Sequence, residues 1–163
     1  EEAVKLLQAF RPDIQSLRDI SPVEMAAYGE YLPEEVKMRA EHVVKEIARV
    51  FSAVTALQRN DHRAFGALMY ASHYSLRDLY QVSHPNLDFL VEQARGLPGC
   101  YGARLTGAGF GGCTVNMVSD QNVDEFIDRL AEGYHNHFQM EARIFRVKAS
   151  QGAVAERMMD GSI

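Results

Sequence analysis

Residues 102–115 read GARLTGAGFGGCTV, and this glycine-rich stretch gives the clearest structural signal in the chain. Four glycines occupy six positions within it: Gly107, Gly109, Gly111 and Gly112. Glycine adopts positive φ angles readily and lets a second backbone or a ligand approach closely. The residues on both sides have the β-branched, alternating pattern that is typical of strands. The stretch therefore predicts two strands joined by a loop that is shaped for close contact.

Familiar glycine motifs fit this loop poorly. The spelling Gly107-x-Gly109-x-x-Gly112 matches the dinucleotide-binding fingerprint, but that motif requires a helix directly after the glycines, and here a strand pattern follows. A Walker loop is excluded because no Gly-Lys-Ser or Gly-Lys-Thr closes the run. A protein-kinase glycine loop would have valine where Thr114 stands. A plain hairpin turn without a ligand stays open, although the surplus of glycines and the apolar Phe110 at the tip favour packing against a partner surface.

Residues 104–113 (RLTGAGFGGC) resemble the third signature motif of the GHMP small-molecule kinases, in the form found in galactokinases. Three other segments support the resemblance: residues 68–83 (LMYASHYSLRDLYQVS), 85–88 (PNLD) and 39–44 (RAEHVV). The resemblance extends from about residue 1 to residue 150. It implies an α+β fold, namely the elaborated ferredoxin-like C-terminal domain of the GHMP kinases, in which an antiparallel sheet is packed with several helices.

The same resemblance implies that a second domain lies outside these residues. Galactokinases carry a sugar-recognition motif, a serine-rich phosphate-binding motif and the catalytic aspartate and arginine in their N-terminal half, and neither motif occurs here. Residues 1–163 are therefore expected to be the GHMP kinase C-terminal domain alone. We expect this domain to have no catalytic residue and no metal ligand of its own, and to be inactive by itself.

By resemblance, the intact protein is expected to transfer the γ-phosphoryl group of ATP to the anomeric hydroxyl of galactose, giving galactose 1-phosphate. ATP and Mg²⁺ would be bound mainly by the N-terminal domain. A glycine loop suits phosphoryl transfer because its peptide groups can approach phosphates without side-chain obstruction. Phe110 is expected to pack between the two domains. The residues expected to line the cleft are Gly107, Ala108, Gly109, Phe110, Gly111 and Gly112, with Thr106 beside them.

Two other functions stay open at this point. Other GHMP sugar kinases, such as N-acetylgalactosamine kinases, share this loop, and the residues that select the sugar belong to the missing half. From a different class, the chain would serve as a non-catalytic small-ligand-binding module or a galactokinase-like regulatory module. The residues encoded upstream of Glu1 would distinguish these functions.

Composition bears on the partners of the protein, its cellular location and the state of its cysteines. The formal net charge of −5 argues against a nucleic-acid partner, which requires a basic face. No apolar run approaches the ~20 residues of a membrane span, and no signal peptide precedes the first helix, so a cytoplasmic protein is expected. Pairing Thr106 with Cys113 would leave Cys100 about 20 Å from Cys113 at ~3.3 Å per residue. Both cysteines are therefore expected to be free thiols.

Helices are predicted on both sides of the hairpin. Apolar spacing predicts a helix over residues 1–10, and residues 21–24 (SPVE) spell a capping box that begins a helix ending near Glu30. Asp61 is expected to cap a helix from residue 62 to about residue 81, and another helix spans about residues 86–96. Either Asp120 or Asn122 is expected to cap a helix after the hairpin.

The remaining segments carry weaker patterns. Residues 16–20 and 142–148 are expected to form two further strands, and the tail from Ser150 a short helix. The longest helix begins at Pro33 and is expected to be core scaffolding. Its apolar stripe consists of Val36, Ala40, Val43, Val44, Ile47, Val50, Phe51, Val54 and Leu57.

Several polar side chains have residue types found in catalytic or metal sites, but their spacing on a helix argues against such sites. Ser72 and His73 point about 100° apart on a helix, so with Asp78 they do not form a nucleophilic triad. This helix is instead expected to support the glycine loop, with His73 near the loop. Whether Ser72 or Arg77 reaches the cleft stays open. His135 and His137 diverge by about 200° on a helix and are not expected to form a metal site.

Overall fold

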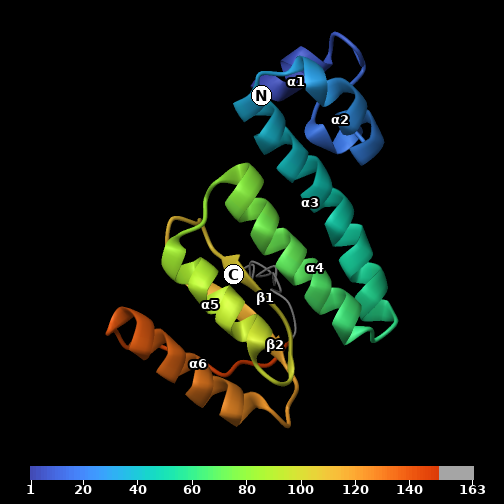
Figure 1. Cartoon of the computed structure of the whole chain (residues 1–163). Helices are drawn as coiled ribbons and strands as arrows, with labels where there is room; N and C mark the ends of the chain where they lie inside the picture. Colours follow the sequence, from blue (N-terminus) through green and yellow to red (C-terminus); the bar gives the residue numbers. More distant parts are fainter. Residues whose placement is uncertain (151–163) are drawn as a thin grey trace, which may run out of the picture.

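The computed structural model describes residues 1–150. Its N-terminal part is a small helical cap made of α1 (Glu2–Leu7), η1 (Leu17–Asp19), α2 (Pro22–Tyr28) and η2 (Gly29–Tyr31). The cap surrounds the beginning of the long helix α3 (Glu34–Gln58) (Figure 1). The buried side chains of the cap and of α3 form one apolar core: Ala3, Leu7, Ile14, Ile20, Met25, Leu32, Ala40 and Val44.

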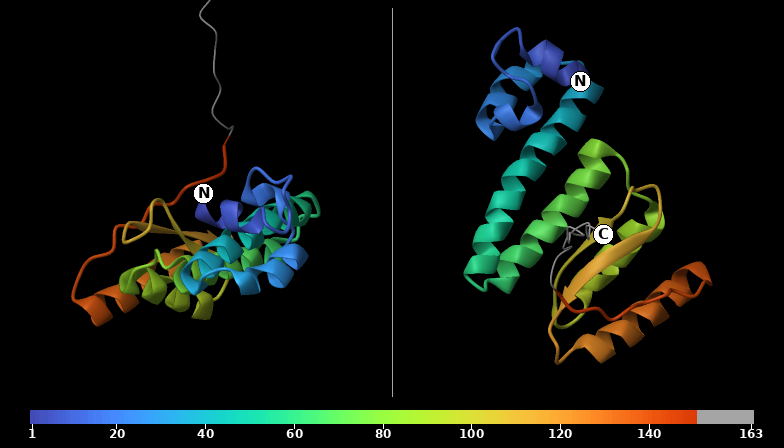
Figure 2. Two further views of the ribbon diagram at one scale, coloured as in Figure 1. Left: turned by 90° about the horizontal axis from the view of Figure 1, so that it is seen from above. Right: turned by 180° about the vertical axis from the view of Figure 1, so that it is seen from behind.

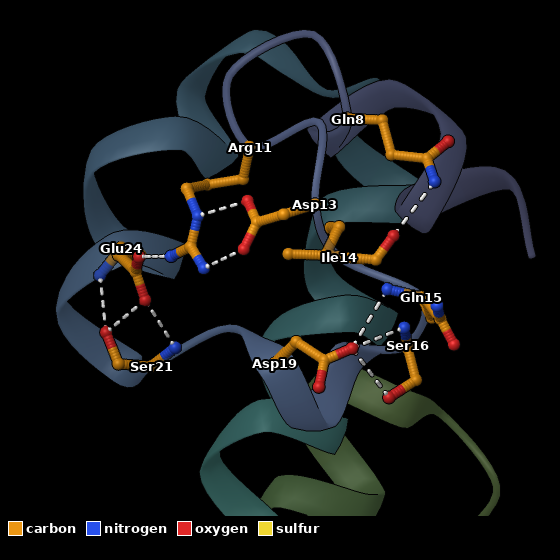
Figure 3. A network of polar contacts seen from close by, with 9 residues as sticks. All are labelled: Gln8, Arg11, Asp13, Ile14, Gln15, Ser16, Asp19, Ser21 and Glu24. Atoms are coloured by element: carbon orange, nitrogen blue, oxygen red, sulfur yellow. Dashed lines mark hydrogen bonds and ion pairs between the residues drawn. The ribbon is translucent and has the colours of Figure 1, made fainter.

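Polar contacts fix the turns of the cap (Figure 3). The predicted capping box is confirmed, because the Glu24 amide donates to Ser21 Oγ while the Ser21 amide donates to Glu24 Oε2 at 2.8 Å. Ser16 and Asp19 form a second capping box, and the amides of Gln15 and Ser16 both donate to the Asp19 carboxylate. The strand predicted over residues 16–20 is therefore wrong, since side-chain capping turns this segment into a 3₁₀ helix.

Helices α3 and α4 (His62–Ser75) run antiparallel beside each other (Figure 1). Asp61 caps α4 as predicted, because its Oδ1 accepts a hydrogen bond from the Ala64 amide at 2.9 Å. The helix continues as the π-helical segment η3 (Leu76–Tyr80) and ends at Gln81, whose φ is +59°. The predicted helix from residue 62 to about residue 81 is thus confirmed, with a change of helix type near its end.

The predicted hairpin is also present. Strands β1 (Cys100–Thr106) and β2 (Cys113–Val118) pair antiparallel, with Thr106 opposite Cys113 as expected. Cys100 lies at the other end of the strand pair, opposite Val118, and both cysteines are free thiols. The view from behind shows the strand pair in front of α4 and α5 (Pro85–Gly96) (Figure 2).

Two glycines allow α4 to lie directly against the backbone of β1. A Cβ atom added to Gly66 would lie 1.9 Å from the Tyr101 carbonyl oxygen, and one added to Gly102 would lie 2.4 Å from the Gly66 Cα. No larger residue fits at this crossing. Helix α6 (Val123–Phe138) completes a second core with α5 and β1. Its buried members are Val91, Ala94, Ala103, Phe126 and Leu130.

The C-terminal end differs from the prediction. Residues 142–148 are neither helix nor strand, so the strand expected there is wrong. Their alternating pattern does not find a hydrogen-bonding neighbour within residues 1–150, and a strand requires one. Asn122 rather than Asp120 begins α6, but its Oδ1 accepts from Ser119 Oγ at 2.7 Å instead of capping the helix. The helix expected after Ser150 lies outside the described residues.

The apolar stripe of α3 is buried along only part of its length. Ala40 and Val44 are buried beneath the N-terminal cap, as predicted. Further along the same helix, four side chains of the stripe are between 48% and 71% exposed. These four residues, which we call the exposed α3 stripe, are Val50, Phe51, Val54 and Leu57. The prediction that the whole stripe lies in the core is wrong for this half, because nothing within residues 1–150 covers it.

Within residues 1–150, no helix combines the length and the apolar character that crossing a membrane requires.

Candidate functional site: the glycine-rich loop

Residues 107–112, which we call the glycine-rich loop, join β1 to β2 without regular secondary structure. The φ angles of its four glycines are +94°, +86°, +135° and +100° in chain order. These values lie in the region that residues with a Cβ atom avoid. Phe110 also has a positive φ of +58°, and its side chain is 73% exposed. The loop therefore needs its glycines for its shape and directs an aromatic side chain into solvent.

One side of the loop rests on Val82, just beyond the end of η3. The Phe110 amide donates to the Val82 carbonyl oxygen at 2.7 Å. A Cβ atom added to Gly109 would lie 2.4 Å from the same oxygen. Only glycine therefore fits here without moving either segment.

The other side of the loop is open. A Cβ atom added to Gly107 or Gly111 would meet no atom within 4 Å, and Thr106 and Ala108 are exposed. A ligand or a second chain can thus reach the peptide groups of this side directly. The expected cleft residues lie together in one segment, but the hollows described below do not include them.

Two surface hollows lie elsewhere on the molecule. One, of about 630 Å³, lies between α3 and α4 and is lined by residues such as Thr55, Ala56 and Leu68. The other, of about 400 Å³, is lined by residues that include Tyr70 and Cys100. Neither is lined by a residue of the glycine-rich loop. Neither hollow is therefore the cleft expected at the loop.

The polar residues of α4 and η3 have separate partners. Ser72 Oγ donates to Glu46 Oε1 at 2.6 Å, and Arg104 Nη1 approaches the same oxygen at 3.3 Å. Arg77 pairs with its neighbour Asp78. This ion pair lowers the pKa of the Asp78 carboxyl below its ordinary value. Ser72 and Asp78 thus bond to Glu46 and Arg77 rather than to His73, in agreement with the helix-geometry argument against a triad.

His73 lies beneath the root of the loop, where sequence reasoning expected it. Its ring is fully buried, and its Nδ1 accepts a hydrogen bond from the Leu105 amide at 3.3 Å. Its Nε2 lies 3.2 Å from Asp88 Oδ1. Burial lowers the pKa of His73, although the charge of Asp88 opposes that shift. Sequence reasoning missed the roles of Val82 and Asp88, although both belong to the segments that carry the family resemblance.

The described residues do not contain a metal centre. Within residues 1–150, no three His, Cys, Asp or Glu side chains come together in a way that could hold a metal ion. His135 Nδ1 lies 3.0 Å from Glu141 Oε1, whereas the His137 ring stacks on Phe89 with centroids 4.3 Å apart. The two histidines therefore serve different contacts.

Comparisons with known proteins show which family the chain is similar to. The family model described as "GHMP kinases C terminal" matches residues 53–136, a segment that contains α4, α5, both strands and the glycine-rich loop. A galactokinase from Roseiflexus sp. (strain RS-1) is 48% identical over 162 residues, which are 99% of this chain and 41% of that protein. The galactokinase of Homo sapiens is 44% identical over 139 residues, which are 85% of this chain and 34% of that protein.

A solved structure has the same fold. The crystal structure of Lactococcus lactis galactokinase complexed with galactose superposes with a TM-score of 0.81 at 39% identity, covering 86% of this chain and 36% of that one. The chain therefore spans about two fifths or less of the length of these relatives. On the family match, the shared fold and the glycine-rich loop, this chain belongs to the GHMP kinase family.

Proposed function

We propose that the intact protein containing this chain is a galactokinase, which phosphorylates galactose to galactose 1-phosphate at the expense of ATP. Relatives named galactokinase at 44–48% identity, and a structural neighbour crystallised with galactose, support it. They also favour galactose over N-acetylgalactosamine as the sugar, and a catalytic over a purely regulatory role.

The observation that carries the proposal is the geometry of the glycine-rich loop. Phosphoryl transfer requires the protein mainly to position the phosphates and to stabilise their charge. A loop with positive φ angles, one side held on Val82 and the other side free of side-chain obstruction, suits a wall that closes on phosphate groups. We propose that residues 107–112 form this wall, with Thr106 at its edge.

The remaining parts of the reaction are proposed to lie outside this chain. ATP supplies the phosphoryl group, and the open peptide groups of the loop fit one face of its phosphate chain. Within residues 1–150 no three His, Cys, Asp or Glu side chains come together to hold a metal ion, and Mg²⁺ is proposed to be bound mainly by the N-terminal domain. Residues 1–163 are proposed to be the C-terminal domain of the longer protein, and the cytoplasm, where ATP is available, is its proposed location.

The exposed α3 stripe and Phe110 support a longer protein. Solvent-facing apolar groups that gather on one surface commonly mark an interface. Each relative has more than half of its length outside the matched region, which supplies a candidate for the covering surface. We therefore propose that the N-terminal domain packs on these side chains.

An enzyme assay with two sugars tests the proposal. The intact protein is mixed with ATP and Mg²⁺, and ADP release is followed with galactose or with N-acetylgalactosamine. We expect turnover with galactose, much slower turnover with N-acetylgalactosamine, and no turnover by the 163-residue chain alone. An intact protein that releases no ADP with galactose would contradict the proposal.

A further inference from the structure

Val82, on which the glycine-rich loop rests, belongs to no helix or strand that would hold it in place. Val82, whose carbonyl oxygen accepts the Phe110 amide, lies between the end of η3 and the start of α5. Its own amide donates to the Leu76 carbonyl oxygen at 3.1 Å, and the preceding Gln81 has a left-handed backbone. Interactions other than helix hydrogen bonds are therefore needed to keep the Val82 carbonyl group in position to accept the Phe110 amide.

Side chains next to Val82 supply that support. Ser83 Oγ donates to Asp88 Oδ1 at 2.5 Å, which ties the segment after Val82 to the first turn of α5. The same carboxylate oxygen lies 3.2 Å from His73 Nε2 on α4. Ser83 and Asp88 thus connect the support of the loop to the fully buried ring of His73.

The other edge of the His73 ring holds the root of the loop. The Leu105 amide donates to His73 Nδ1, and Leu105 lies one residue before the end of β1. Because a backbone amide only donates, Nδ1 carries no proton, and the ring proton is on Nε2, facing Asp88. Nε2 has no hydrogen bond of good geometry within residues 1–150, so its contact with Asp88 is a close electrostatic approach.

We propose that His73, Asp88 and Ser83 are positioning residues for the glycine-rich loop. His73 holds β1 at the residue before the loop begins, and through Asp88 and Ser83 it holds Val82, on which the loop rests. One buried ring therefore sets the distance between the root of the loop and its support. None of these three side chains is proposed to touch a substrate.

Hydrogen exchange at the Phe110 amide tests this arrangement without any enzyme assay. The Ser83→Ala variant removes one hydroxyl group and leaves both helices intact. In the 163-residue chain, we expect its Phe110 amide to exchange about 5- to 10-fold faster, the change expected when one ordinary hydrogen bond no longer holds the segment. The exchange of the Val91 amide in the core serves as the internal reference.

A matched pair of histidine variants separates positioning from general destabilisation. His73→Asn keeps an acceptor near the Nδ1 position for the Leu105 amide but removes the group that faces Asp88. His42→Asn makes the same change at another buried histidine, whose Nδ1 lies 2.8 Å from Ser75 Oγ. We expect His73→Asn to speed exchange at Phe110 relative to Val91, and His42→Asn to leave that ratio unchanged. Equal ratios in the two variants, or an unchanged Phe110 rate in Ser83→Ala, would overturn the proposal.

A kinetic measurement on the intact protein connects the arrangement to catalysis, and this part alone rests on the proposed function. We expect Ser83→Ala to lower kcat several-fold at an unchanged KM for galactose, because only the phosphate wall moves. Faster exchange at Phe110 with unchanged kcat would support the positioning residues and contradict the proposed role of the loop. Unchanged exchange at Phe110 would overturn the positioning proposal whatever the kinetics.

Discussion

The two halves of α3 carry one continuous apolar stripe but have opposite environments. In the first half, Ala40 and Val44 are buried beneath the helical cap that precedes them in the chain. In the second half, the exposed α3 stripe faces outward, with Phe51 the most exposed of its four side chains. The sequence pattern of α3 therefore predicts which face of the helix is apolar. Whether that face is buried depends on the other segments that pack against it.

A substitution in the core that covers the first half of α3 and one in the exposed α3 stripe should differ most in their effect on stability. Leu7 is fully buried in the core that covers α3, and Leu7→Ala should lower the free energy of unfolding by about 2–5 kcal/mol. Phe51→Ser should change it by no more than about 0.5 kcal/mol in the chain alone, because its ring is already exposed. Urea unfolding of both variants measures the difference.

The intact protein sharpens this comparison. If a second domain covers the exposed α3 stripe, Phe51→Ser should be clearly more destabilising there than in the isolated chain. An equally small change in the free energy of unfolding in both proteins would contradict the proposal that the stripe lies in a domain interface. A large effect in the isolated chain would show that the stripe is already packed.

A smaller effect is expected from the turns that build the cap. Ser21→Ala removes the side-chain acceptor at the start of α2 and should lower the free energy of unfolding by about 1 kcal/mol. Ser52→Ala is the matched control in the uncovered half of α3, where the Ser52 hydroxyl only bonds back to the Ala48 carbonyl oxygen. Thermal unfolding should show a lower Tm for the first variant and little change for the second. Equal shifts would mean that the cap does not depend on this box.

The smallest effect near neutral pH should come from two buried histidines. Burial lowers the pKa values of His42 and His73 below the ordinary value of 6.5. The unfolded chain therefore binds more protons in the pH range between the folded and unfolded pKa values, and stability rises with pH there. We expect full stability from this source above about pH 6.5 and progressive loss as the pH falls below it. The charged groups near His42 are Glu46, Arg49 and Arg104, and those near His73 are Arg77, Asp78, Asp88 and Glu92.

His42→Asn tests the origin of this acid sensitivity. His42 lies in the covered half of α3, between Ala40 and Val44, and has a buried partner in Ser75. Replacing it should flatten the dependence of the urea midpoint on pH below 6.5, whatever its effect at pH 7. An unchanged slope would assign the acid sensitivity to other groups.

Local signals in the sequence predicted much of the fold. The hairpin register, the Ser21 capping box, the Asp61 cap and the order of the helices follow from turn chemistry and apolar spacing. The 3₁₀ helix at residues 17–19 also had a local signal, because Ser16 and Asp19 have the spacing of a capping box. The strand expected over residues 16–20 did not take this box into account.

The errors that remain concern partners distant in the sequence. Residues 142–148 have a strand pattern, but a strand exists only where a neighbouring strand accepts and donates its hydrogen bonds. The site was likewise predictable in part. The loop and its positive φ angles follow from the glycines, whereas the support by Val82 joins segments 28 positions apart and has no periodic signature.

The most direct test of the central proposal, that the glycine-rich loop forms a wall of a phosphate cleft, is the kcat of Gly109→Val in the intact protein. A Cβ atom at this position would lie too close to the Val82 carbonyl oxygen, and the φ angle of Gly109 is positive, which residues with a side chain disfavour. The loop should therefore shift. Gly96→Val is the control, because a Cβ atom there meets nothing within 4 Å. We expect kcat to fall at least about tenfold in Gly109→Val, which equals about 1.4 kcal/mol of transition-state stabilisation, and to stay unchanged in Gly96→Val. A folded Gly109→Val protein with the kcat of the parent protein would contradict the proposal.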